Sequence, residues 1–129
     1  MKTHYEYLLL VFCFILVTGC TTPSQKIQDE LKDQSLSDFV AYIDCMKAAA
    51  NYYAAYTATP HEIADAAQSK CSAKFHTYKR SSEIYLTSSS PPSARAQARR
   101  GAQNLAQEVK NGMKEKVVQW VIDNRLQKK

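Results

Sequence analysis

Cysteine is the residue type in this chain with the clearest potential for chemistry. A cysteine thiol can form a disulfide, bind a metal ion or carry an acyl chain. The 129-residue chain has four: Cys13, Cys20, Cys45 and Cys71. The first two lie within an N-terminal apolar run and just after it, and the other two lie in the more polar remainder. We therefore expect different chemistry from each pair.

The apolar run at the N-terminus has the length of a signal-peptide core. It extends without interruption over residues 8–17, whereas a membrane-spanning helix needs about 20 apolar residues. The sequence Val17-Thr18-Gly19-Cys20 at its end resembles the lipobox of bacterial lipoprotein precursors. This resemblance covers residues 1–21 only. It implies that residues 1–19 are a signal peptide and that Cys20 is acylated after cleavage.

The same resemblance implies a location for the mature chain. Thr21, and not an aspartate, follows the lipobox cysteine, which is the pattern of lipoproteins sent to the outer membrane of Gram-negative bacteria. We expect a protein of the cell envelope, held in the membrane by its N-terminal lipid and facing the periplasm. The alternative is an ordinary secretory signal with a chance cysteine at its end. In either case the compartment is oxidising.

The rest of the chain has the composition of a helical protein. It contains only three glycines and four prolines, and alanine, a strong helix former, is abundant. Apolar residues recur every three or four positions, which predicts helices over about residues 36–56, 60–86 and 93–126. Thr59, Pro60 and Glu62 have the pattern of a capping box at a helix start. Residues 20–34 are polar and predict a lipidated N-terminal tether, within which the i, i+4 spacing of Ile27 and Leu31 is compatible with a partly helical segment.

These elements predict an all-α domain over residues 35–129. We expect a disulfide-linked antiparallel helical hairpin with a third long C-terminal helix packed on it, as a small three-helix bundle. Cys45 lies fourteen residues before Thr59 and Cys71 lies twelve after it. A hairpin that turns at Thr59 therefore brings the two thiols to the same height on facing helices.

Cys45 and Cys71 could instead be free buried thiols or ligands of a metal ion. A structural metal site needs about four ligands, and only His61 and His76 could supplement the two thiols in this part of the chain. We therefore expect a disulfide and no metal. The His61-Glu62 pair begins like a zinc-protease helix, but Asp65 stands where the second histidine is required.

No other motif indicates catalysis. The serines gather in a loop near Pro91, and the chain has no glycine-rich phosphate loop. The sequence predicts a protein that is not an enzyme, with no cofactor and no small-molecule substrate.

The tyrosines near the predicted hairpin turn are the first candidate binding surface. Tyrosine is enriched where proteins meet, and three tyrosines cluster here: Tyr52, Tyr53 and Tyr56. The alternative is that they pack between helices, as we expect of Tyr42 and Tyr78.

The basic C-terminal part of the chain is the second candidate. Residues 93–129 hold nine Lys and Arg against three Asp and Glu. The residues proposed to contact an anionic envelope polymer are Arg95, Arg99, Arg100, Lys110, Lys114, Lys128 and Lys129. Scattered basic residues can equally form a solvated helix face, and nucleic acid is not expected outside the cytoplasm. The terminal lysine resembles that of the helical lipoprotein joined to murein.

The sequence therefore predicts a non-enzymatic envelope lipoprotein that presents a helical surface to a protein partner, as accessory, assembly, exclusion or immunity lipoproteins do. The alternative is a structural lipoprotein that contacts peptidoglycan, or is linked to it, through the basic C-terminal helix.

Overall fold

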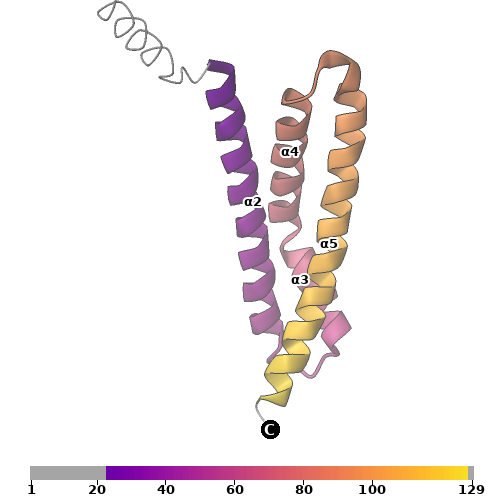
Figure 1. Cartoon of the computed structure of the whole chain (residues 1–129). Coiled ribbons are helices and arrows are strands. Elements are labelled where there is room, and N and C mark those ends of the chain that lie inside the picture. The colour runs from indigo at the N-terminus through magenta and orange to yellow at the C-terminus, as the bar shows by residue number, and fades with distance from the viewer. Residues whose placement is uncertain (1–22, 128–129) are drawn as a thin grey trace, which may run out of the picture.

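The computed structural model describes residues 23–127, and this part of the chain is helical without a strand (Figure 1). The predicted signal peptide, Cys20, Lys128 and Lys129 lie outside the described residues. The elements in chain order are α2 (Pro23–Tyr53), α3 (Pro60–Lys70), α4 (Ser72–Ser88), the 3₁₀ turn η1 (Pro92–Ala94) and α5 (Arg95–Leu126). The prediction of an all-α chain is confirmed for these residues.

The helices form three antiparallel legs. α2 descends the length of the molecule, α3 and α4 together return, and α5 descends again beside them (Figure 1). α4 packs against both α2 and α5, and α3 packs mainly against α5 and α2. The start of α2 and the α4–α5 turn therefore lie at one end of the molecule, which we call the turn end. The α2–α3 turn and the end of α5 lie at the other.

The prediction of three helices is wrong in one respect, because the second helix is divided at Cys71. Cys71 has φ −96° and ψ 9°, outside the usual helical values. Its N–H still donates to the carbonyl of Ala67, and its carbonyl still accepts from the N–H of Phe75, both at 3.0 Å. The chain therefore bends here without losing its backbone hydrogen bonds. The bend lets α3 follow α5 while α4 packs on α2.

The predicted disulfide is confirmed. Cys45 and Cys71 are bonded with their Cα atoms 5.8 Å apart, which joins the middle of α2 to the bend between α3 and α4. Cys71 has no exposed surface. The bond therefore lies inside the molecule, at the point where the second leg changes direction.

The first helix begins earlier than predicted, at Pro23 instead of about residue 36. The predicted tether is thus helical from Pro23 onward. Proline suits the first position of a helix, and the residues that follow it include no glycine. Ser35 therefore lies in mid-helix, where it is only 8% exposed.

The core runs along the axis between the legs. Its largest fully buried side chains are Tyr42, Met46, Ile63, Cys71, Val117 and Val121. Tyr42 packs against Phe75 with ring centroids 5.5 Å apart, and Phe39 packs against Tyr78 at 5.2 Å. The expected packing role of Tyr42 and Tyr78 is therefore confirmed, and burial raises the pKa of both phenols.

The first half of α5 turns alanines toward the core. Ala102 and Ala106 are buried, whereas Leu105 is 44% exposed. Small side chains at these positions allow the facing helices to approach closely. Packing distance, more than hydrophobicity, decides which face of α5 is turned inward here.

Candidate functional site

The three candidate tyrosines form one cluster at the end of α2. The ring centroids of Tyr52 and Tyr53 lie 5.1 Å apart in an edge-on arrangement, and Tyr56 lies 6.0 and 6.4 Å from them. Tyr52 and Tyr56 are each 56% exposed, whereas Tyr53 is half-buried against the core. The rings of Tyr52 and Tyr56 are thus available at the surface, and the Tyr53 ring packs between them and the core.

Hydrogen bonding sets the direction of the two exposed phenols. The hydroxyl of Tyr56 donates to that of Tyr52 over 3.4 Å. This bond, together with the nearby Tyr52 group, raises the pKa of Tyr56. Both side chains can offer hydroxyls and ring faces to a partner.

Lys70 adds a positive charge to the cluster. Its ammonium lies 4.5 Å from the centroid of the Tyr52 ring and 5.6 Å from that of Tyr53, within the range of a cation–π contact. Lys70 is the last residue of α3. No local sequence pattern indicates this contact, because the contact depends on how α3 packs beside α2.

A small apolar cleft lies beside the tyrosines. It has a volume of about 260 Å³ and is lined by Tyr53, Tyr56, Ala58, Ile63 and Ala66, with Glu62 also at its wall. Clefts of this kind accept an apolar side chain of a partner. We call the exposed rings of Tyr52 and Tyr56 together with this cleft the tyrosine surface.

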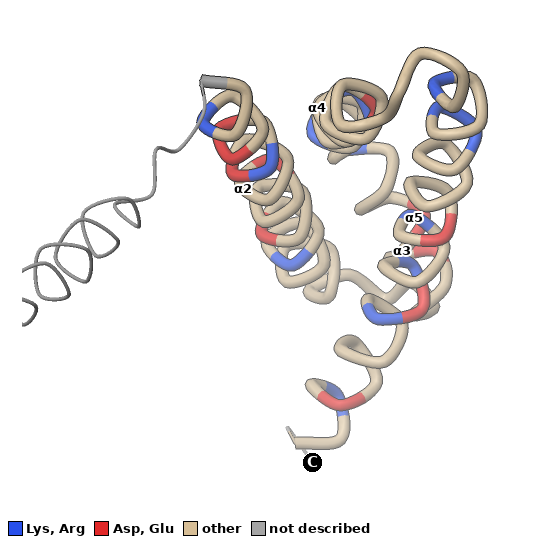
Figure 2. Tube along the Cα trace, turned by 45° about the horizontal axis from the view of Figure 1, so that its top comes forward, with Lys and Arg blue, Asp and Glu red and all other residues tan. Residues whose placement is uncertain are grey.

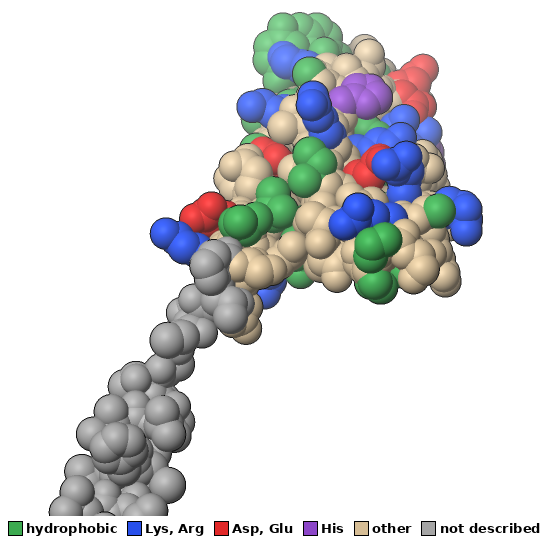
Figure 3. All heavy atoms as spheres, turned by 90° about the horizontal axis from the view of Figure 1, so that it is seen from above, with side chains coloured by type: hydrophobic (Ala, Val, Ile, Leu, Met, Phe, Trp, Pro, Cys, Tyr) green, Lys and Arg blue, Asp and Glu red, His purple; other side chains and the backbone are tan. Residues whose placement is uncertain are grey.

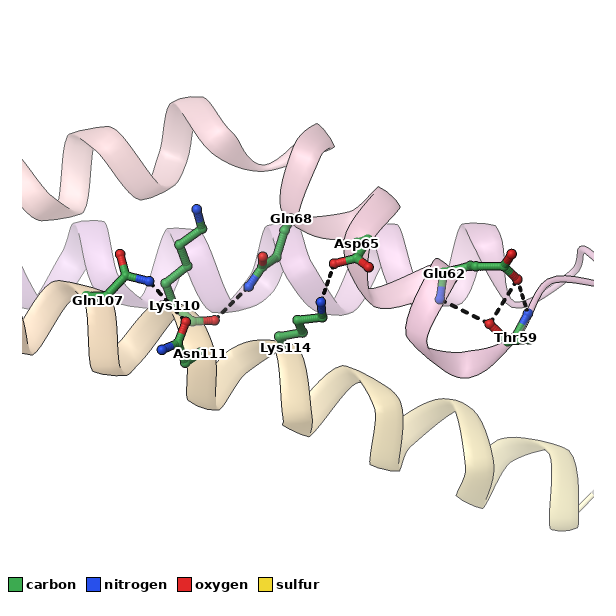
Figure 4. A network of polar contacts seen from close by, with 8 residues as sticks. All are labelled: Thr59, Glu62, Asp65, Gln68, Gln107, Lys110, Asn111 and Lys114. Carbon is green, nitrogen blue, oxygen red and sulfur yellow. Dashed lines mark hydrogen bonds and ion pairs between the residues drawn. The ribbon is translucent and has the colours of Figure 1, made fainter.

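The turn that carries the tyrosine surface is held from both sides. The predicted capping box is present: the N–H of Thr59 donates to Glu62 over 2.7 Å, and the N–H of Glu62 donates to the Thr59 hydroxyl over 3.3 Å (Figure 4). The bond from the Thr59 N–H, and a further bond that the Thr59 hydroxyl donates to the carboxylate over 2.8 Å, lower the pKa of the Glu62 carboxyl. The turn therefore has a defined conformation.

Arg125 of α5 holds the same turn from the other leg. Its guanidinium donates to the carbonyl of Ala58 over 2.7 Å and to that of Tyr56 over 3.3 Å. Arg125 was not among the predicted site residues, since a bond across 67 positions of sequence has no local signature. It joins the last turn of α5 to the tyrosine surface.

The predicted basic residues do not form one surface. Lys114 pairs with Asp65 of α3 at 2.5 Å, and the carbonyl of Lys110 accepts from the Gln68 amide over 2.7 Å (Figure 4). The Lys110 ammonium lies 5.5 Å from the Phe75 centroid. Both lysines therefore belong to the contact of α5 with α3 and α4.

The other basic candidates lie far from these two. Arg95, Arg99 and Arg100 occupy the start of α5, and Lys128 and Lys129 follow its far end, outside the described residues. A helix of 32 residues is about 48 Å long. The described residues of this candidate contact are therefore spread along α5.

The described residues carry no arrangement typical of catalysis or metal binding. Across positions 23–127 no group of three or more His, Cys, Asp or Glu side chains could hold a metal ion. His61 is exposed at the start of α3 and lines a cleft of about 470 Å³ with Lys114, Glu115 and Val118. None of these is placed as a nucleophile beside a base.

Comparison with known proteins identifies no family for this chain. No protein-family model, no curated protein and no solved structure matches the chain. Within the helices described here, none is long and apolar enough to cross a membrane. The features that bear on function are therefore the lipobox resemblance and the geometry of the tyrosine surface.

Proposed function

We propose that this protein is a non-enzymatic lipoprotein of the cell envelope that presents its tyrosine surface to a protein partner. In this proposal the lipid on Cys20 anchors it in the outer membrane, facing the periplasm. The observation that carries the proposal is the exposure of Tyr52 and Tyr56 beside an apolar cleft, on a turn held by Thr59, Glu62 and Arg125.

The position of this surface supports the proposal. Pro23 begins α2 three residues after Cys20, and the tyrosines lie at the other end of that 31-residue helix. A helix of this length extends about 46 Å. The anchor and the tyrosine surface therefore lie at opposite ends of α2, which holds the surface out from the membrane where a periplasmic protein can reach it.

The chemistry of the surface fits a protein better than a small ligand. Tyrosine gives a large contact area with few rotatable bonds, and such rings often dominate the binding energy of an interface. The adjacent cleft has room for one apolar side chain and has only Glu62 as a charged residue in its lining. We expect the partner to insert an apolar or aromatic residue beside Tyr56.

Site-specific photocross-linking in cells that produce the full chain tests this function. A photoreactive phenylalanine analogue is placed at Tyr52 or Tyr56, and the matched control is placed at Leu105, an apolar residue 44% exposed on α5. We expect one protein to be captured from the two tyrosine positions and not from Leu105. Capture of murein fragments from the basic part of α5, with none from the tyrosines, would favour the peptidoglycan-binding alternative.

A further inference from the structure

A second group of basic residues gathers at the turn end, and it comes from two helices. Lys79 and Arg80 lie on α4, and Arg95, Arg99 and Arg100 lie at the start of α5. Figure 2 shows blue segments on α4 and on the first turns of α5. Among the described residues of these two segments the only acid is Glu83, which pairs with Arg99. The fold therefore concentrates charge that is dispersed in the sequence.

Three of these basic residues, Lys79, Arg80 and Arg99, border a cleft between α4 and α5. It has a volume of about 490 Å³, and its lining includes His76, Lys79, Arg80, Thr87 and Arg99. Glu83 accepts from Nε of Arg99 over 2.9 Å, while the Arg99 side chain stays 63% exposed. The Nη donors of its guanidinium therefore remain free to bind an anion, with Glu83 holding the group in place.

The cleft lies at the end of the molecule that a lipid anchor would hold against the membrane. Pro23 follows Cys20 by three positions, and a stretch of that length reaches at most about 11 Å even when extended. The start of α2 and the α4–α5 turn lie at the same end (Figure 1). Viewed onto this end, the surface shows many Lys and Arg side chains (Figure 3).

Apart from Glu83, which lines the cleft and pairs with Arg99, the acidic residues near this end lie on α2. The first three turns of α2 carry Asp29, Glu30 and Asp33 against Lys26 and Lys32. Anionic lipid attracts basic side chains within about a Debye length, roughly 8 Å at physiological salt, and repels acidic ones. The uneven charge of the turn end would thus tilt the α4–α5 side toward the lipid phosphates.

We propose that the cleft bordered by Lys79, Arg80 and Arg99 binds the phosphate groups of anionic lipids in the membrane that anchors the chain. The inference rests on the proposed lipid anchor. The lipid at Cys20 holds the protein in the membrane, and the cleft sets its orientation. With the cleft against the membrane, the tyrosine surface points away from it.

Chemical footprinting of arginine on the full lipidated chain tests this inference. The chain is reconstituted into vesicles of phosphatidylcholine alone or with phosphatidylglycerol, treated with phenylglyoxal, and analysed by mass spectrometry. We expect phosphatidylglycerol to slow the modification of Arg95, Arg99 and Arg100 about threefold or more, and about 1 M salt to remove the effect. Modification of Arg125, at the other end of α5, should not change.

A matched pair of variants shows whether the cleft is responsible. Lys79→Gln with Arg80→Gln should abolish the protection of Arg95 and Arg100, whereas Lys47→Gln with Lys116→Gln removes the same charge elsewhere and should preserve it. Equal modification rates in both kinds of vesicle would overturn the inference. Equal protection by inorganic phosphate without vesicles would also overturn it, because the ligand would then not be a lipid.

The intact mass of the purified chain reports acylation separately. A chain without lipid at Cys20 contradicts the anchor of the proposed function. An acylated chain that shows no protection contradicts only the proposed cleft.

Discussion

At the scale of single residues, a few side chains determine how the legs of this protein are joined. Cys45 and Cys71 form a covalent bond between α2 and the bend of the second leg. Arg125 joins the end of α5 to the α2–α3 turn by two hydrogen bonds. The disulfide thus fixes α2 to the second leg, and Arg125 fixes the turn that carries the tyrosine surface.

The disulfide should contribute a large part of the stability of the domain. It closes a loop of 26 residues, so on the chain-entropy model Cys45→Ala with Cys71→Ala should lower the free energy of unfolding by about 3–4 kcal/mol. Urea unfolding of the variant measures this loss, and the reduced wild-type chain is the control. Identical unfolding midpoints for the oxidised and reduced wild type would contradict the prediction.

The capping box predicts a pH dependence of stability. The pKa of Glu62 in the folded chain is lowered by the bonds from Thr59, so its stabilising effect is full above the ordinary glutamate pKa of 4.5. It is lost as the pH falls through the lowered pKa of the folded state. The difference in unfolding free energy between wild type and Glu62→Gln should therefore shrink between about pH 6 and pH 3.

Comparing thermal unfolding of the two chains across this pH range measures the effect. Asp44→Asn removes an exposed carboxylate from α2 and serves as the control. A constant difference between wild type and Glu62→Gln at all pH values would exclude the capping carboxylate as its source.

At the scale of the elements, the length of α2 and the bend at Cys71 are the two departures from the simple hairpin. α2 continues to Pro23 through residues that the polar composition had marked as a tether. The bend gives the second leg two directions, so that α3 can follow α5 while α4 packs on α2. The bend places both α3 and α4 against α2 and α5.

Replacing Lys32 by proline tests whether residues 23–34 form a helix or a tether. Lys32 is exposed in the middle of the first half of α2, so Lys32→Pro breaks only the helix and should cost about 3 kcal/mol or more locally. We expect a loss of far-UV circular dichroism and faster amide exchange over residues 23–34. Lys32→Ala should leave the circular dichroism and the amide exchange unchanged. If Lys32→Pro also left them unchanged, residues 23–34 would be a tether and not a helix.

At the scale of the whole molecule, the chain has two ends with different surfaces. The turn end carries the start of α2 and the basic cleft, and the opposite end carries the tyrosine surface (Figure 1). A lipoprotein anchored at its N-terminus would present these ends to different surroundings. This arrangement unites the proposed anchor, the proposed lipid contact and the proposed partner surface in one orientation.

Substitution of the exposed tyrosines should separate binding from stability. Because Tyr52 and Tyr56 are each 56% exposed, Tyr52→Ala with Tyr56→Ala should change the unfolding temperature little and weaken partner capture about 30-fold or more, as for interface residues that dominate binding. Tyr42→Ala, at a position 1% exposed, should instead cost about 3–5 kcal/mol of stability. Undiminished capture by the double variant, measured by co-purification, would contradict the role of the tyrosines.

The sequence by itself determined the features that depend on local spacing. Apolar periodicity gave the helical class, the Thr59 pattern gave the start of α3, and the distances of Cys45 and Cys71 from that turn gave their pairing. These predictions succeeded because helix geometry converts sequence separation into height and direction. The clustering of Tyr52, Tyr53 and Tyr56 followed for the same reason.

Only the tertiary structure decided the features that depend on which helices meet. The bend at Cys71, the contact of Lys70 with Tyr52, and the bonds of Arg125 all need a neighbour that is distant in sequence. The basic cleft likewise combines residues of α4 and α5. Local propensity carries no information about such neighbours, because packing against another helix can extend, bend or expose a segment whatever its own pattern predicts.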